Sequence, residues 1–201
     1  LWKLHPILSW VNDKTGLLFK RNEAPVIGIP DRLTHGEVIY IVSGSMPNLK
    51  STPLIDEWFG LLYKNGEFKQ VFSMEEIVRK TGISGKIPNT GNISEADIAA
   101  ASKLLPDVVA KAKAQLGGFF EKYQKDMDPL LDKEVDKLIE LQGRHHEYVQ
   151  LTLFDNERKR SEQERRVDEL FDQFVNWVKD TLSIQNNPYI RIVALLMGVE
   201  K

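Results

Sequence analysis

The chain has 201 residues, of which 42% are hydrophobic and 28% charged, so it can form a packed core and is neither collagen-like nor disordered throughout. Its formal net charge of -2 excludes a uniformly basic nucleic-acid binder, although a local basic strip remains compatible with it. The absence of cysteine excludes disulfides, thiolate metal sites and cysteine nucleophiles. No apolar run reaches the roughly 18 residues that a membrane span needs and no secretory signal leads the chain, so we expect no contact with a membrane.

The N-terminal section contains most of the turn signals. Residues 5–18 begin with a His-Pro pair and have the apolar spacing of a helix. Residues 37–43 form an apolar, β-branched run that predicts a buried strand. Two further runs, 53–63 and 67–72, are separated by Asn-Gly, which predicts a hairpin because both residues tolerate the positive φ of a type I′ turn.

A short helix is predicted to follow the hairpin, with Ser73 as its N-cap, Glu76 completing a capping box and Gly82 ending it. Residues 82–93 are rich in glycine, but a phosphate-binding loop is excluded because Ile87 follows the Gly-Lys pair. We therefore predict a connector and a domain boundary here.

Residues 94–182 have the periodicity of long helices. Ser94 is the predicted N-cap of the first, and Pro106 should kink or restart it. From 119 to 149 apolar residues recur every three or four positions, which favours an αα-hairpin or a short coiled coil.

A third helix is predicted over about 156–182. Residues 156–166 contain no apolar side chain and should be solvated or docked on something polar. The rest has a predicted buried face, with Trp177 beside it; its members are Val167, Leu170, Phe171, Phe174, Val175, Val178 and Leu182.

The chain ends in an apolar run at 189–197 that we expect to return to the N-terminal strands. The predicted fold class is therefore α+β, a small antiparallel sheet closed by the C-terminal strand with a long inserted helical hairpin or coiled-coil-like section. Residues 1–93 and 183–201 would form the core, and residues 94–182 an excursion from it or a second subdomain.

No catalytic, cofactor or metal residue is predicted in this chain. His145 and His146 are adjacent, and neighbouring residues on a helix point about 100° apart, which disfavours a shared metal ion. There is no G-x-S-x-G motif for a serine nucleophile. The carboxylate pairs Asp56-Glu57 and Glu75-Glu76 are explained by a strand border and by a helix cap.

The candidate nucleic-acid contacts are five cations within nine residues, Arg158, Lys159, Arg160, Arg165 and Arg166. Two interpretations remain open. In the first, acidic residues between the cations form ion pairs with them on a solvated helix, as Glu162 could with Arg158, Arg165 and Arg166. Alternatively, arginines along one helix could follow a phosphate backbone.

Four blocks of sequence resemble the C-terminal region of bacterial Swi/Snf-related helicases, in the DEAD/DEAH-like superfamily 2. They are HPILSW at 5–10, RNEAPVI at 21–27, SGSMPNLKSTPLIDEW at 43–58 and RRVDELFDQFVNWVKDTLSIQNNPYIRIVALLMG at 165–198. In that family a charged, coiled-coil-like stretch separates the blocks, as residues 94–164 do here.

The resemblance implies a non-catalytic accessory domain of an ATP-dependent, DNA-acting motor in the bacterial cytoplasm. ATP and magnesium would bind in the motor domains, none of whose motifs occurs in this chain, and Leu1 in place of a methionine suggests a piece of such a parent. Expected partners are the parent's motor domains and DNA. The first alternative is a module for protein interaction or self-association through the long helix at 119–150, and an enzyme is the least favoured.

Overall fold

The structure is a computed structural model that describes residues 7, 10, 11, 14, 23–85, 93–151 and 157–199. Its contacts divide the chain into two compact units. Unit 1 comprises residues 1–44, 57–114 and 190–201, and unit 2 comprises 45–56 and 115–189. The boundaries that we predicted near 93 and 182 lie between elements of secondary structure. The boundaries between the two units instead lie inside strands and inside one long helix.

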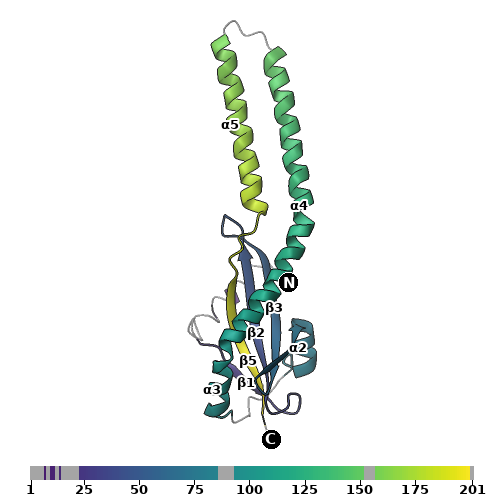
Figure 1. The fold of residues 1–201 in the computed structure, drawn as a ribbon, viewed down its shortest axis with the longest axis vertical. Coiled ribbons are helices and arrows are strands. Elements are labelled where there is room, and N and C mark those ends of the chain that lie inside the picture. Colours follow the sequence, from purple (N-terminus) through teal and green to yellow (C-terminus); the bar gives the residue numbers. More distant parts are fainter. Residues whose placement is uncertain are drawn as a thin grey trace. The chain divides into compact units, whose positions relative to one another are not determined.

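Five strands form one sheet in the order β1-β5-β2-β3-β4, which confirms the α+β class (Figure 1). The strands are β1 (Val26–Ile29), β2 (Glu37–Pro47), β3 (Pro53–Lys64), β4 (Glu67–Ser73) and β5 (Tyr189–Gly198). All four predicted strands are present, and β5 does join the N-terminal strands. β1 was not predicted. It pairs in parallel with β5, while β3 and β4 pair antiparallel. The prediction of an antiparallel sheet closed by the C-terminal strand is therefore wrong in two respects, because the sheet is mixed and open and β5 lies inside it.

The local signals in this section are confirmed. Asn65 and Gly66 take φ values of 53° and 83° in the β3–β4 turn, as a type I′ hairpin requires. Ser73 caps α2 (Met74–Thr81), with both hydrogen bonds of the capping box to Glu76, and Gly82 ends the helix in the left-handed region at φ 69°.

In unit 1 the central strands are covered on both faces. On one face Ile39, Ile41 and Leu62 join Ile77 of α2 in the main apolar cluster. On the other face Tyr40 donates a hydrogen bond to the Ala101 carbonyl at 2.8 Å. Burial of this tyrosine raises its pKa to about 12. Coverage of both faces explains why residues 38–42 are continuously apolar instead of alternating.

Helix α3 (Glu95–Lys103) begins at the predicted cap, Ser94, whose hydroxyl accepts the Asp97 N–H at 3.1 Å. It stops at Leu104, and α4 (Leu105–Leu151) starts at once with Pro106 in its first turn, so the predicted restart is confirmed. In unit 1 the Tyr63 hydroxyl donates to Asp107 Oδ2 at 2.6 Å, which attaches the first turn of α4 to the sheet.

In unit 2, α4 and α5 (Glu157–Leu182) form an antiparallel hairpin (Figure 1). Midway along it Gln142 Nε2 donates to Asp168 Oδ1 at 2.7 Å, and at its base the Tyr123 hydroxyl donates to the Leu182 carbonyl at 3.1 Å. The predicted helical hairpin is therefore present. None of the described helices is both long and apolar enough to cross a membrane.

Two predictions fall largely outside the described residues. Of the helix predicted at 5–18, residues 7, 10, 11 and 14 are described, and they are helical. Of the connector predicted at 82–93, residues 86–92 lie outside.

Candidate binding surface on helix α5

The five predicted cations occupy the first three turns of α5 but do not share one face. A helix turns about 100° per residue, so Arg158 and Arg165, seven apart, lie on one side, and Lys159 and Arg166 lie next to them. Arg160 is eleven residues before the buried Phe171 and is therefore on the row that faces α4. It pairs there with Glu164 at 3.4 Å.

Ion pairs partly neutralise the strip. Glu162 pairs with Arg166 at 3.9 Å, as predicted, and Arg165 pairs with Glu169 at 3.7 Å. These pairs are long and solvent-exposed, so each contributes well under about 1 kcal/mol and leaves its arginine able to exchange partners.

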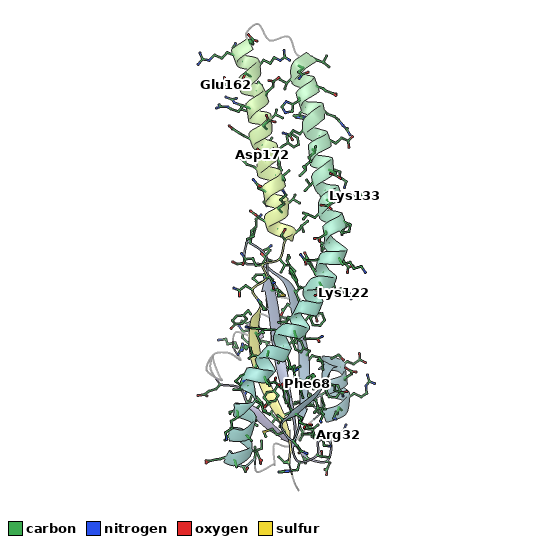
Figure 2. The ribbon with its side chains drawn as sticks, in the orientation of Figure 1. Arg32, Phe68, Lys122, Lys133, Glu162 and Asp172 are labelled. Atoms are coloured by element: carbon green, nitrogen blue, oxygen red, sulfur yellow. The ribbon has the colours of Figure 1, made fainter. Side chains whose placement is uncertain are left out.

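The predicted buried face of α5 needs correction. Phe171 is buried at 8% exposure, but Leu170 and Phe174 are each 49% exposed and Trp177 is 57% exposed. The apolar residues extend around more of the helix than a single neighbouring helix can cover, so Phe171 packs toward α4 and a second row stays open. This second row, Leu170, Phe174 and Trp177, is hereafter the α5 row; Figure 2 draws the side chains of both helices.

The α5 row borders a shallow depression of about 290 Å³, whose lining is completed by Gln173. The row is spaced i, i+4, i+7, which places the three side chains along one straight line on the helix surface.

A turn between two strands supplies a cation at the base of this row. The Lys50 amine lies 4.6 Å from the centroid of the Trp177 ring and donates to Thr181 Oγ1 at 2.8 Å. Cation–π contact and hydrogen bond together fix the charge at this end of the row.

Asn48 holds that turn in place. Its side chain is buried, donates to the Thr181 carbonyl at 2.9 Å, and accepts the Lys50 and Thr52 N–H groups at 2.9 Å each. Asn48 and Lys50 both lie in the block at 43–58 that carries the family resemblance, but their role was not predicted, because their partners on α5 are 133 and 131 residues away along the chain.

The two adjacent histidines have separate partners. The His145 ring meets Phe171 edge-on at 5.8 Å, and His146 Nε2 lies 2.7 Å from Asp168 Oδ1. The hydrogen bond from His146, with a second from Gln142, lowers the pKa of Asp168. Among the described residues no group of three or more potential metal ligands comes together.

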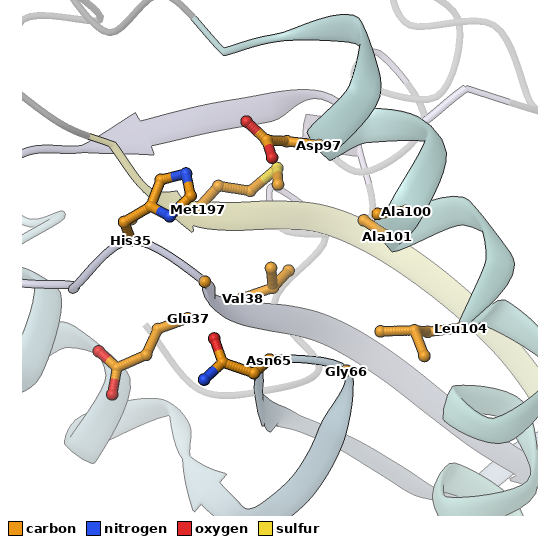
Figure 3. Close-up of a pocket in the computed structure, with 12 residues that line it drawn as sticks. His35, Glu37, Val38, Asn65, Gly66, Asp97, Ala100, Ala101, Leu104 and Met197 are labelled. Carbon is orange, nitrogen blue, oxygen red and sulfur yellow. The ribbon is translucent and has the colours of Figure 1, made fainter.

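Unit 1 contains a second hollow, of about 210 Å³, between the start of β2, the β3–β4 turn, α3 and the end of β5 (Figure 3). Its floor includes Val38 and Met197. Its two carboxylates have structural partners: Glu37 accepts the Thr34 N–H at 3.0 Å, and Asp97 accepts the Ser94 hydroxyl at 2.7 Å.

The electrostatics of Glu37 agree with a structural role. Burial would raise its pKa, but the Thr34 hydrogen bond and the nearby Lys80 and Lys64 amines outweigh this and lower it. Within the described parts of the chain, every buried side-chain nitrogen and oxygen has a hydrogen-bond partner. We therefore place the candidate site on α5.

No known protein family, no curated protein and no solved structure matches this chain.

Proposed function

We propose that this chain is a non-catalytic accessory domain of an ATP-dependent, DNA-acting motor, and that it positions the motor by docking a partner on α5. The observation that carries the docking role is the α5 row, three large apolar side chains between 49% and 57% exposed along one line. Single exposed apolar residues are ordinary, whereas a contiguous row beside a depression is typical of an interaction site.

The motor context is supported by the four sequence blocks that resemble Swi/Snf-related helicases. ATP and magnesium would belong to the motor domains of the parent, and the proposal assigns no catalytic or metal-binding role to this chain. Bacterial cytoplasm is the location that goes with it.

The test is the double variant Leu170→Ser, Phe174→Ser in the full-length parent. We expect basal ATP hydrolysis to be unchanged, and its stimulation by DNA to fall by about ten-fold, because the contact that positions the motor is lost. The matched control, Ile139→Ser with Leu141→Ser, alters two apolar residues of α4 that are 56% and 45% exposed. Equal stimulation in all three proteins would contradict the docking role, and a parent without any ATP hydrolysis would contradict the motor context.

A second candidate function is phosphate contact, favoured by the outer position of Arg158, Lys159, Arg165 and Arg166 on α5. At most four phosphates would be met, so the logarithm of the DNA affinity should fall with the logarithm of salt with a slope no steeper than about -4. We expect Arg165→Glu with Arg166→Glu to weaken binding more than Arg160→Glu, whose side chain faces α4. This function should be abandoned if neither duplex nor single-stranded DNA binds at about 50 mM salt.

A further inference from the structure

We propose that the α5 row binds an amphipathic helix of a partner protein whose apolar side chains are flanked by carboxylates. This inference rests on the docking role proposed above and names the chemistry of the docked partner. It follows from the charges at the two ends of the row.

The surface line that contains the α5 row has no acidic residue. Continuing the i, i+3, i+4 spacing in both directions gives Lys159, Gln163, Arg166, Leu170, Phe174, Trp177 and Thr181. The acidic residues of α5 begin on the adjoining row, where Glu162, Glu169 and Asp180 each follow a member of the line by three positions. Apolar side chains thus occupy the centre of the line, and cations occupy the end toward the helix N-terminus.

The other end of the line is also cationic. The Lys50 amine lies over Trp177 and is hydrogen-bonded to Thr181. Because Asn48 anchors the turn that holds Lys50, this charge is positioned before any partner arrives. A ligand that covers the apolar centre therefore meets a cation at each end.

A helix is the partner shape that this surface fits. Anchors at i, i+4 and i+7 present a straight ridge about 10 Å long, which packs against a complementary apolar stripe on another helix. The depression beside Phe174 and Trp177 has room for an apolar side chain between them. Carboxylates one to two turns beyond that stripe would reach Lys50, and at Arg166 they would exchange with Glu162, whose ion pair with Arg166 is long and exposed.

A second copy of this chain fits the same surface poorly. If two α5 rows met antiparallel with Leu170 of each against Trp177 of the other, Arg166 would lie opposite Thr181, where Lys50 is held. Two like-charge contacts would result, one at each end, and such contacts oppose association. The charges therefore favour an acidic partner over self-association.

The test uses two labelled helical peptides of about 18 residues, with leucines at i, i+4 and i+7 and either glutamates or lysines at both ends. Binding to the whole chain is measured by fluorescence anisotropy at about 50 mM salt. We expect the glutamate peptide to bind at least about ten-fold more tightly than the lysine peptide. Phe174→Ser should remove this binding.

A charge-reversal variant makes the test specific to the ends of the row. Lys50→Glu with Arg166→Glu should reverse the preference between the two peptides. Lys122→Glu with Lys133→Glu, on α4, changes the net charge by the same amount and should leave the preference unchanged.

The outcomes separate this inference from the docking role. If both peptides bind equally and Phe174→Ser abolishes binding, the row docks a helix but the acidic partner is wrong. A dimer that Phe174→Ser dissociates would show that a second copy covers the row, and would overturn the inference while leaving docking intact. If neither peptide binds and no dimer forms, both the inference and the docking role fail.

Discussion

Asn48 is a buried polar residue that joins a turn of unit 2 to the end of α5. It is one of two polar residues that are buried among the described residues, at 2% exposure, and its side chain uses both its oxygen and its nitrogen. An isolated bridge between Asn48 and Ile184 adds a backbone link at the same point. The turn that carries Lys50 is therefore held at the end of α5 by the Asn48 side chain, by the Lys50 hydrogen bond to Thr181 and by this backbone bridge.

We predict that Asn48→Ala lowers the free energy of unfolding by about 2–3 kcal/mol, since it leaves two N–H groups and one carbonyl without their partner. Urea denaturation of the whole chain measures this. Asn176→Ala, an exposed position on α5, is the control and should change stability by less than about 0.5 kcal/mol. Equal stability of Asn48→Ala and the control would refute the anchoring role.

The Asp168 carboxylate predicts a pH dependence of the hairpin. Hydrogen bonds from His146 and Gln142 lower the pKa of Asp168 in the folded chain below the ordinary value of 3.8. The stability that these bonds contribute is therefore fully present above pH 3.8 and is lost as the pH falls through the folded-state pKa. Asp168→Asn should therefore lower the thermal midpoint at about pH 5, and the difference between the two midpoints should shrink below about pH 4. Circular dichroism measures the midpoints, and Asp172→Asn serves as the exposed control. If the difference in thermal midpoint between the unmodified chain and Asp168→Asn stayed the same down to about pH 2, the stabilising role of the Asp168 carboxylate would be contradicted.

At the scale of elements, predictions from sequence succeeded where the signal is local. The Ser73–Glu76 capping box, the Asn65-Gly66 turn and the restart of the helix at Pro106 each depend on residues within four positions of one another. β1 was missed because it has only four residues and its pairing with β5 joins positions about 170 apart. The spacing of apolar residues within a segment does not show which distant strand the segment will pair with.

Prediction of the candidate site was less complete for a related reason. The cations at 158–166 could be named from the sequence, but which of them face α4 depends on the register of the hairpin. The exposure of Leu170, Phe174 and Trp177 depends on how much of α5 the single neighbouring helix covers. The contribution of Lys50 depends on a contact across 131 residues.

Two glycines give opposite predictions at this scale. A side chain at Gly198, at the end of β5, would place its Cβ 2.0 Å from the Thr34 carbonyl oxygen, whereas one at Gly143, inside α4, would meet nothing within 4 Å. We expect Gly198→Ala to destabilise the chain by about 1–3 kcal/mol and Gly143→Ala to stabilise it by about 0.5–1 kcal/mol. Chemical denaturation of both variants checks this, and the same sign for the two would contradict the close approach at Gly198.

At the scale of the whole molecule, the net charge of -2 does not show where the positive charges lie, and their positions decide how two copies of the chain interact. The cationic ends of the α5 row oppose pairing of two copies, so we predict a monomer at about 100 μM in sedimentation experiments near 50 mM salt. Lys50→Glu should promote self-association, because the introduced carboxylate of one copy could then meet Arg166 of another. Concentration-dependent dimerisation of the unmodified chain would contradict this.

The division of the chain into units has a practical consequence for anyone who wishes to transplant the hairpin. Residues 115–189 are contiguous and look separable, but unit 2 also needs residues 45–56 from between two strands. A hairpin grafted as 115–189 alone would lack both Asn48 and Lys50, and so would present a bare apolar line with a positive charge at only one end. The proposed binding surface combines two distant stretches of the sequence, and we expect a graft of 115–189 alone to lose its preference for an acidic partner.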